Sequence, residues 1–290
     1  MIRAFSEISA LARRELTKWY RSPILVFMTS VQPLLWMGLY GKALNLTGLL
    51  RIPDDLLSQL PPEATSRIAD ITNEVLSRFF GSAEIDFFSY IAVGMMGVIL
   101  LFTSMASGMS VAWDRRLGFL GKLLCTPIKR SSILFGKVSA AVVRGVAQSL
   151  LVMLIGLSLG LRLRLAGPAE LLGALLILVL LCGSFSTIII ALTLRIRTWE
   201  YHIAIGNLVT LPLMFTSSAL YPVSLMPDWL RLLASVNPLT HGIEALRYLL
   251  LLGESVTSQL ITPHLVFLLA FSASSYLLGS YLSSISLRSI

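Results

Sequence analysis

The chain has 290 residues, of which 56% are hydrophobic and only 13% are charged, with a formal net charge of +8. A soluble protein of this length needs more polar surface than this composition supplies, so a soluble enzyme, a disordered chain and a disulfide scaffold are excluded. An all-α integral membrane protein remains, because lipid accepts an apolar exterior and a spanning helix satisfies its own backbone.

Residues 1–22 are predicted to form an amphipathic helix at the membrane surface. Apolar side chains such as Phe5 and Leu11 fall near one face, and charged ones such as Arg13 and Lys18 fall mostly on the other. Several cations before Pro23 suit an anionic inner leaflet. The alternative is a helix that packs on the protein's own cytoplasmic loops.

Six stretches are apolar and long enough to span a bilayer, which takes about 20 residues each. Pro212 and Pro222 interrupt the fifth of them. We expect one domain over residues 1–290, because the rest of the chain shows no linker or repeat. The predicted spans are 23–44, 87–112, 134–160, 169–194, 202–222 and 261–284.

The orientation follows from the distribution of Lys and Arg. If the N-terminus is inside, the inner segments hold about twice as many of these residues as the outer ones, as the positive-inside rule requires. This distribution explains the positive charge without nucleic acid as a partner. We therefore expect a multi-pass protein of the inner (plasma) membrane with both termini cytoplasmic. The polar segment 45–86 becomes an external loop that holds an amphipathic helix.

The segment 222–258 is too polar and too broken to form a full span. We expect a broken re-entrant helical hairpin here, between spans five and six, that dips into the outer leaflet. Asp228 with Arg231, and Glu244 with Arg247, are i,i+3 pairs that neutralise each other in a partly dry setting. A simple external loop with structural ion pairs is the alternative.

Sequence signatures of catalysis are missing from the chain. It has no G-x-x-x-x-G-K-[ST] phosphate loop, no H-E-x-x-H and no G-x-S-x-G, and Cys125 and Cys182 lie far apart. We therefore expect no enzyme, no metal and no cofactor in this chain. If ATP drives the protein, a separate chain must bind ATP and magnesium.

The loop 113–133 carries the most informative pattern. Leucines from Leu117 to Leu124 lie on a short amphipathic stretch that Thr126-Pro127 ends, and Arg130 follows. A short helix parallel to the membrane, with apolar and cationic faces, suits docking to a cytosolic partner. An ordinary cationic loop that obeys the topology rule is the alternative.

This loop resembles the permease subunits of type-2 ABC exporters, which move drugs, lipids and polysaccharides outward. The chain departs from the family pattern at Arg116 and Gly121, where glutamates are usual, and at Phe119, where threonine is usual. The matching residues are Asp114, Arg115, Gly118, Leu120, Leu123, Leu124, Thr126, Pro127, Ile128, Arg130, Ile133, Gly136 and Lys137.

A second region of the chain is similar to the same family. The stretches S-A-L-Y-P, M-P-D-W-L, N-P-L-T and A-L-R follow each other between residues 218 and 247 in the family's order, with Ala219 in place of a usual glycine. The resemblance and the predicted hairpin together suggest an external gate. Its candidate residues are Tyr221, Pro222, Pro227, Trp229, Asn237, Pro238, Glu244 and Arg247.

The resemblance implies a permease in which two copies, expected to be identical, form a pathway and each docks one ATP-binding cassette subunit. The expected docking residues are Asp114, Arg115, Gly118, Leu120, Leu123, Leu124, Thr126, Pro127 and Arg130. The expected pathway-lining residues are Phe102, Thr103, Thr210 and Phe215. Arg144 either snorkels to the inner surface or lines an inner entrance.

The expected cargo is an amphipathic drug or lipid, and a lipid-linked polysaccharide or glycoconjugate is the alternative. An autonomous secondary carrier or channel is the alternative of another class. Ion-coupled carriers often place acids within their spans, whereas the confident spans of this chain hold no Asp or Glu far from their ends.

Overall fold

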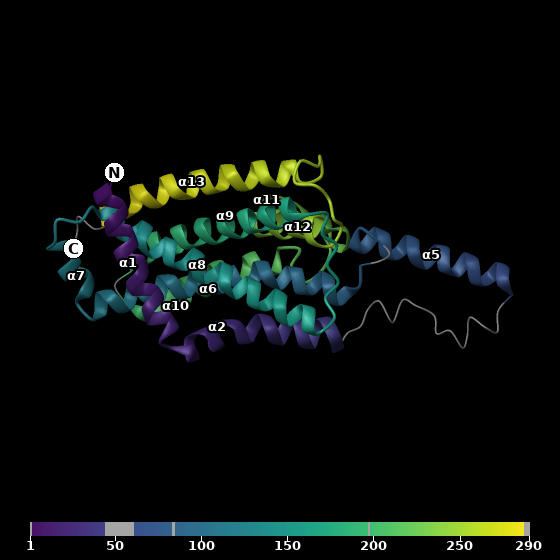
Figure 1. Cartoon of the computed structure of the whole chain (residues 1–290), viewed down its shortest axis with the longest axis horizontal. Coiled ribbons are helices and arrows are strands. Elements are labelled where there is room, and N and C mark those ends of the chain that lie inside the picture. The colour runs from purple at the N-terminus through teal and green to yellow at the C-terminus, as the bar shows by residue number, and fades with distance from the viewer. Residues whose placement is uncertain (1, 44–60, 83–84, 197, 287–290) are drawn as a thin grey trace.

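The protein is a bundle of helices in a computed structural model that describes residues 2–43, 61–82, 85–196 and 198–286. Throughout those ranges the regular elements are helices, which confirms the all-α prediction for them. The longest helices run side by side along one axis (Figure 1). Four are long and apolar enough to cross a membrane, and they coincide with predicted spans two, three, four and six: α6 (Phe87–Arg116), α8 (Arg130–Ser158), α9 (Pro168–Thr193) and α13 (Thr262–Ser286).

The other two predicted spans are not among these four helices, although the helical residues of the first run over nearly its whole predicted range. Span one consists of α2 (Pro23–Trp36), with 14 residues, and a π-helical continuation, η1 (Met37–Ala43). Span five is α10 (Trp199–Phe215), with 17 residues, and it ends soon after Pro212. At 1.5 Å per residue, α2 and α10 alone reach about 21 and 26 Å, less than the roughly 30 Å of a hydrocarbon core. The six-span topology therefore stays a prediction.

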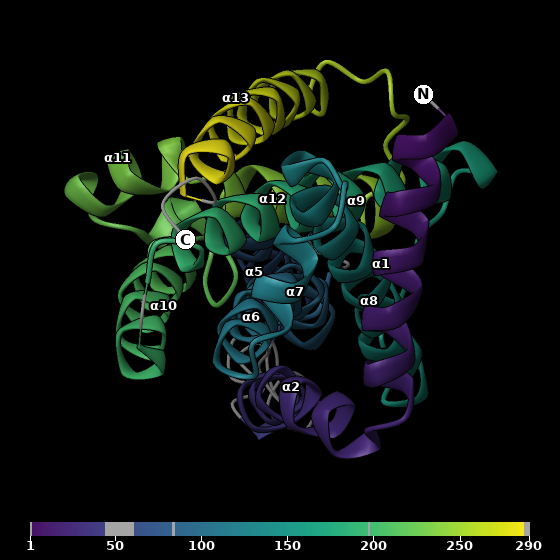
Figure 2. The same ribbon diagram turned by 90° about the vertical axis from the view of Figure 1, so that its left-hand side faces the viewer.

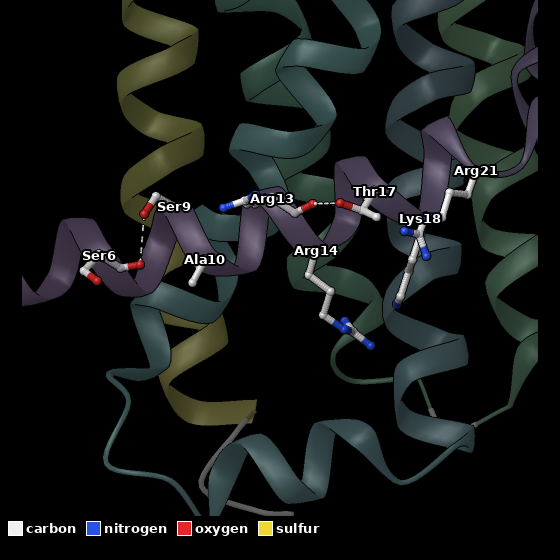
Figure 3. A pocket seen from close by; sticks show the side chains of 8 residues that line it. All are labelled: Ser6, Ser9, Ala10, Arg13, Arg14, Thr17, Lys18 and Arg21. Carbon is white, nitrogen blue, oxygen red and sulfur yellow. Dashed lines mark hydrogen bonds between the residues drawn. The ribbon is translucent and has the colours of Figure 1, made fainter.

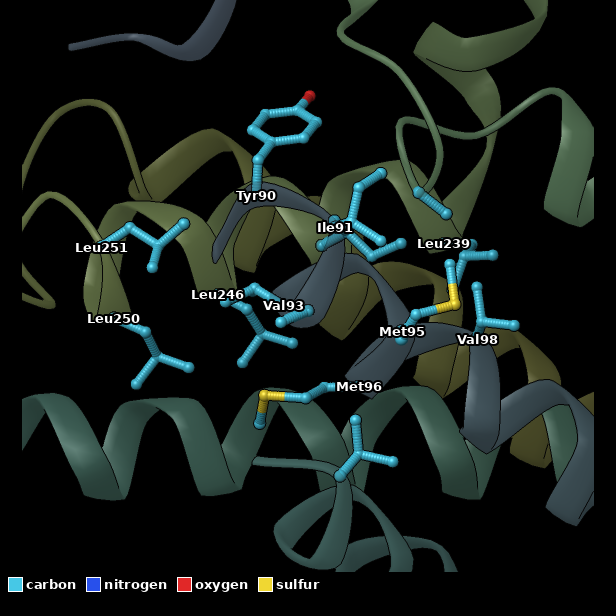
Figure 4. Packing of buried hydrophobic residues seen from close by; sticks show 14 of the residues in the cluster. Tyr90, Ile91, Val93, Met95, Met96, Val98, Leu239, Leu246, Leu250 and Leu251 are labelled. Carbon is cyan, nitrogen blue, oxygen red and sulfur yellow. The ribbon is translucent and has the colours of Figure 1, made fainter. Parts of the chain in front are cut away.

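Helix α6 forms the centre of the bundle and is buried on all sides over most of its length. Its apolar residues pack against α12 (Pro238–Leu250), as Figure 4 shows for Met95 and Leu239. Gly94 permits a close approach, because a Cβ there would lie 2.3 Å from the carbonyl oxygen of Ala219. A helix surrounded by protein explains a continuous apolar run that shows no amphipathic pattern.

The segment predicted as a broken hairpin contains η2 (Val223–Leu225), α11 (Asp228–Val236) and α12. The break falls at Asn237, whose side chain caps α12 by accepting a hydrogen bond from the Leu239 amide at 2.9 Å. Helix α12 packs between α6, α9 and α13, whereas α11 exposes Trp229 and Leu232. Entry of this segment into the membrane stays a prediction.

Different helices lie at the two ends of the bundle. Helix α1 (Ile2–Tyr20) crosses one end, where α7 (Phe119–Leu124) and the last turns of α13 also lie (Figure 1). Helix α5 (Pro62–Phe80) is the amphipathic helix expected in the external loop, and it extends away from the opposite end. Of the residues placed on its apolar face, Leu76 is buried and Ile71 is 61% exposed, so α5 does not lie flat on the bundle. Residues 44–60 and 83–84 of that loop lie outside the described ranges.

Candidate functional site

The loop between α6 and α8 contains the short helix that the sequence predicts. After α6, the backbone of Gly118 takes a left-handed conformation with φ of 71°, which glycine adopts without strain. Helix α7 follows at once and runs for six residues. The hydroxyl of Thr126 then donates to the carbonyl of Leu123 at 2.6 Å, and Pro127 precedes the start of α8.

The residues predicted to dock a partner fall into two groups. Asp114, Leu120 and Leu123 are buried, and the two leucines pack with Leu11 of α1 and Ile133 of α8. Arg115 and Leu124 are half-buried, while Gly118, Thr126, Pro127 and Arg130 are exposed. The buried residues hold the loop on the bundle, and a partner can reach only the exposed ones.

Arg115 joins the loop to the neighbouring helix. Its guanidinium donates hydrogen bonds to the carbonyl oxygens of Leu194 and Ile196, just after the end of α9. Those carbonyls follow the last helical turn and have no partner within the helix. Arg115 thereby couples the loop to α9 through its own side chain.

A buried set of charges joins α1, α6 and α8. Asp114 accepts from Lys137 at 2.6 Å, from Arg14 at 3.1 Å and from Lys18 at 3.0 Å. Glu15 accepts from Lys137 at 3.1 Å, and from the Ser110 hydroxyl at 2.6 Å. Arg14 and Lys18 also pair with Glu15, at 2.9 and 3.3 Å. We call Arg14, Glu15, Lys18, Asp114 and Lys137 the inner charge cluster.

The electrostatics keep Glu15 ionised. Burial by itself raises the pKa of this carboxyl, but Lys137, the Ser110 hydroxyl and Lys18 together hold the pKa below its ordinary value. The guanidinium of Arg14 also lies 3.4 Å from the ring centroid of Phe119, which brings α7 into the same unit.

Sequence reasoning missed most of this cluster. It placed Arg14 and Lys18 on the charged face of a helix that lies on the membrane or packs on cytoplasmic loops, and did not single out Glu15 at all. Lys137 entered only as a motif match. The two acids among the cations of α1, Glu7 and Glu15, were the available signal, because a buried carboxylate needs a cation beside it.

An open groove of about 1010 Å³ follows the outer surface of α1 (Figure 3). Its charged lining residues are all basic. Figure 3 shows the Arg14 side chain directed toward α7, below α1 in that view. The groove suits an acidic surface of a partner. Its lining residues are Ser6, Ser9, Ala10, Arg13, Arg14, Thr17, Lys18 and Arg21.

A second pocket, of about 350 Å³, lies behind α1 and is lined by residues of α1, α2, α6 and α8. We call it the polar pocket. Thr103, predicted to line the pathway, donates to Gln148 Oε1 at 2.6 Å in its wall, and Gln148 Nε2 donates to Ser30 at 3.3 Å. Arg144 also lines it and donates to Ser107 at 3.0 Å.

The remaining pathway-lining predictions do not meet in one cavity. Thr210 lines an apolar cavity of about 200 Å³ together with Phe185 and Phe271. Phe102 is half-buried, and Phe215 is 46% exposed at the end of α10. Among the described residues, Thr103 and Thr210 thus line two separate cavities, and the pathway stays a prediction.

The predicted external gate is held together by Arg247. This buried side chain pairs with Glu244 at 2.8 Å and donates to the carbonyls of Tyr90 and Ser218 at 3.1 and 2.8 Å. Its guanidinium also lies 3.3 Å from the ring centroid of Tyr90. Arg247 thus joins α12, the start of α6 and the turn after α10.

The other gate residues surround this centre. The Tyr221 hydroxyl donates to the carbonyl of Phe215 at 3.1 Å, and Asn237 Nδ2 donates to that of Leu213 at 2.8 Å. Pro222 and Pro238 are buried, whereas Pro227 and Trp229 are exposed. Both expected i,i+3 pairs are present, because Asp228 also pairs with Arg231, at 3.3 Å.

A metal site is not evident in the part of the chain that the structure describes, which holds no group of three His, Cys, Asp or Glu side chains suited to one. His241 and His264 form only a pair, with their Nδ1 atoms 2.9 Å apart. Cys125 is exposed and Cys182 is buried, and both thiols are free.

Comparison with known proteins shows similarity to transporters. The sequence profile of the ABC-2 type transporter family matches residues 6–251. A "Putative transport permease ycf38" of Cyanophora paradoxa is 31% identical over 248 residues, which cover 84% of this chain and 73% of that protein. The "Daunorubicin resistance ABC transporter permease protein DrrB1" of Streptomyces coeruleorubidus is 28% identical over 182 residues, 63% and 60% of the two chains. "Nodulation protein J" of Sinorhizobium fredii is 28% identical over 124 residues, 43% and 46% of the two chains.

Proposed function

The chain belongs to the ABC-2 type transporter family, and from this premise we propose that it is the permease subunit of an ATP-driven exporter of amphipathic drugs or lipids. Members of this family are transport permeases rather than enzymes. In the proposal, ATP and magnesium bind to a separate ATP-binding cassette subunit, and one such subunit docks on each of two permease copies.

The observation that carries the proposal is the inner charge cluster. It fastens α1, α6 and α8 together beneath α7, with Asp114 and Lys137 almost fully buried. A loop anchored in this way moves as a unit with its helices, because separating buried ion partners is costly. In the proposal, a movement of the ATP-binding cassette subunit that pushes or pulls on the loop is therefore transmitted to the helices of the bundle.

The ATP-binding cassette subunit is proposed to contact the exposed residues of the loop between α6 and α8. These residues are Leu117, Gly118, Thr126, Pro127 and Arg130, and Leu117 is 72% exposed. The basic groove along α1 lies at the same end of the bundle and supplies a complementary surface for acidic residues. Buried Asp114, Leu120 and Leu123 support docking indirectly by holding this surface in place.

The pathway is proposed to form between two copies of the chain. Helix α10 exposes Leu208 and Phe215, and the predicted lining residues are not joined within one copy. Pairing through α10 covers this apolar surface and forms the shared route between the two copies. We take the two copies to be identical, with a sister permease as the alternative.

The proposed topology has six crossings, counting α2 with η1 as the first and α10 as the fifth. Helix α1 and the end of α13 lie at the same end of the bundle, which suits an even number of crossings and termini on one side (Figure 1). We place that side in the cytoplasm and the protein in the inner (plasma) membrane. Residues 222–258 then form the external gate.

The cargo class is supported by the similarity to a permease named for daunorubicin resistance, together with a pocket lined by both charged and apolar side chains. A lipid-linked polysaccharide is the alternative cargo. A secondary carrier is disfavoured, because in the four long helices of the described chain the acids lie near the ends, namely Asp114 in α6 and Glu170 in α9.

The test is reconstitution of the chain with a candidate ATP-binding cassette protein that co-purifies with it. We expect cargo to stimulate ATP hydrolysis and transport to require ATP in proteoliposomes. Fluorescent daunorubicin, a short-chain fluorescent lipid and a lipid-linked oligosaccharide separate the cargo classes. Transport by this chain alone, without nucleotide, would refute the proposal in favour of an autonomous carrier.

A further inference from the structure

Arg144 is a buried cation without a direct ion pair, although the Glu15 carboxylate lies near enough to act on its charge. Only 9% of the residue is exposed, its Nη2 donates to the Ser107 hydroxyl, and its Nε has no hydrogen-bond partner. None of the carboxylates in the described chain forms an ion pair with it. A buried, unpaired guanidinium donor is costly, and the cost is recovered when an acceptor binds.

The charge around the polar pocket favours an anion as that acceptor. Glu15 and Asp114 are the acids of its lining, and both already pair with Lys137, Arg14 and Lys18. With Arg144, these groups comprise four cations against two carboxylates. A bound anion at Arg144 therefore lowers the electrostatic energy of the whole group, whereas a cation raises it.

The shape of the pocket favours the headgroup of an amphiphile. Polar side chains gather beside Arg144, namely Thr29, Thr103 and Gln148, while much of the remaining lining is apolar, with Trp19, Ala106 and Met109. Its rim includes Trp113 and Leu117, which are 43% and 72% exposed. A space of about 350 Å³ admits a headgroup but not a whole lipid, so the apolar chains have to lie along the rim.

From these observations we propose that the polar pocket between α1, α2, α6 and α8 binds the phosphate headgroup of an anionic membrane lipid through Arg144. Figure 2 shows the four helices from the end that α1 crosses, with α1 beside α8 and α6 at the centre. The site does not rest on the proposed export function, because one chain builds it without a partner. Free inorganic phosphate is the other source of the same chemistry.

Binding can be measured by fluorescence, because Trp19 and Trp113 line the pocket. The full chain, in neutral detergent, is titrated with brominated phosphatidylglycerol, which quenches nearby tryptophan, and in parallel with brominated phosphatidylcholine. We expect saturable quenching by phosphatidylglycerol alone. Arg144→Gln should weaken it about tenfold, the effect of losing one charge-assisted hydrogen bond, and Arg144→Lys should weaken it less.

Two further variants keep the test decisive. Ala106→Phe fills the pocket without changing its charge and should also abolish the saturable phase. Arg195→Gln removes an exposed cation outside the pocket and should leave the saturable quenching by phosphatidylglycerol unchanged. Thermal unfolding shows whether each variant is folded. If Arg144→Gln does not fold, the result for Ala106→Phe decides the test.

The outcomes separate the explanations. Equal quenching by both lipids, or wild-type affinity in Arg144→Gln and Ala106→Phe, overturns the proposal. Competition by millimolar inorganic phosphate without any phosphatidylglycerol preference assigns the site to free phosphate and overturns the lipid assignment. If the wild-type chain binds phosphatidylglycerol but shows no ATP-driven transport in the reconstituted system, the export function is refuted and the lipid site is still supported.

Discussion

Single charged side chains hold the inner end of the bundle together. Lys137 donates to both Glu15 and Asp114, and all three residues are almost fully buried. Removing one partner from such a set leaves a buried charge uncompensated, which costs far more than losing a surface ion pair. The contribution of each side chain therefore depends on its burial more than on its charge.

At this scale we predict that Lys137→Ala destabilises the protein by about 3–5 kcal/mol, because two buried carboxylates lose their shared donor. Thermal unfolding in detergent measures the change. Arg78→Ala is the matched control, since Arg78 pairs with Glu74 on the exposed surface of α5 and should cause no measurable change. Equal stability of the Lys137 variant and the wild type would contradict a structural role for the inner charge cluster.

Motif matching identified Asp114 and Lys137 individually but could not identify their partners. Glu15 lies about 100 residues before Asp114, and nothing in either local sequence specifies the pairing. The i,i+3 pairs were predictable, because helical geometry places such residues together whatever the fold. Contacts between distant helices depend on how the bundle packs.

Asn237 illustrates how one residue defines an element. Its side chain accepts from the Leu239 amide, and its Nδ2 donates to the end of α10. Pro238 follows as the first residue of α12, a position that proline favours because its missing amide would have no partner there. The break between α11 and α12 is therefore specified locally.

We predict that Asn237→Ala destabilises the protein by about 1–2 kcal/mol, through loss of the cap of α12 and of the link to α10. Hydrogen exchange should rise first in the opening turn of α12. Ser235→Ala is the control, because Ser235 is exposed near the end of α11 and its hydroxyl, the group that is removed, bonds only to the Leu232 carbonyl of its own helix. Similar exchange in both variants would argue against the capping role.

The loop 113–133 yields a contrast between two of its leucines, Leu117 at the end of α6 and Leu123 in α7. Leu117→Asp changes a side chain that is 72% exposed, so we predict normal folding but loss of co-purification with the ATP-binding partner. Leu123→Asp places a carboxylate in the apolar contact with Leu11 and Ile133, so we predict misfolding. Size-exclusion profiles and pull-down yields distinguish the two.

The opposite pattern would place the docking surface elsewhere. If Leu123→Asp folds and releases the partner while Leu117→Asp retains it, Leu123 must contact the partner directly. Gly121→Ala is the control, because a Cβ there meets no atom within 4 Å and should disturb neither property.

For the whole molecule, the free cysteines provide a test of orientation. Cys125 is exposed just after α7 and Cys182 is buried within α9. We predict that a membrane-impermeant maleimide labels the chain in inside-out vesicles and not in right-side-out vesicles. The label should vanish in Cys125→Ser and persist in Cys182→Ser. Labelling only in right-side-out vesicles would reverse the proposed topology.

The apolar pattern predicted the long helices because lipid imposes it on every residue that it touches. Predicted and observed bounds of α9 differ by one residue at each end. The pattern predicted α1 as well, but not which way its charges face, since Glu15 points into the protein. It also overestimated the fifth span, where α10 ends at Phe215.

The sequence by itself determined that this protein is helical and belongs in a membrane, and it identified the loop 113–133 by its resemblance to the family, because composition, period and motif are local properties. Only the tertiary structure decided that Asp114 and Leu123 face inward, that Arg144 lies unpaired beside a pocket, and that Arg247 joins three segments. The reason is physical. Burial and charge pairing arise between helices that are distant in sequence, and their energies are set by the low-dielectric packing that brings them together.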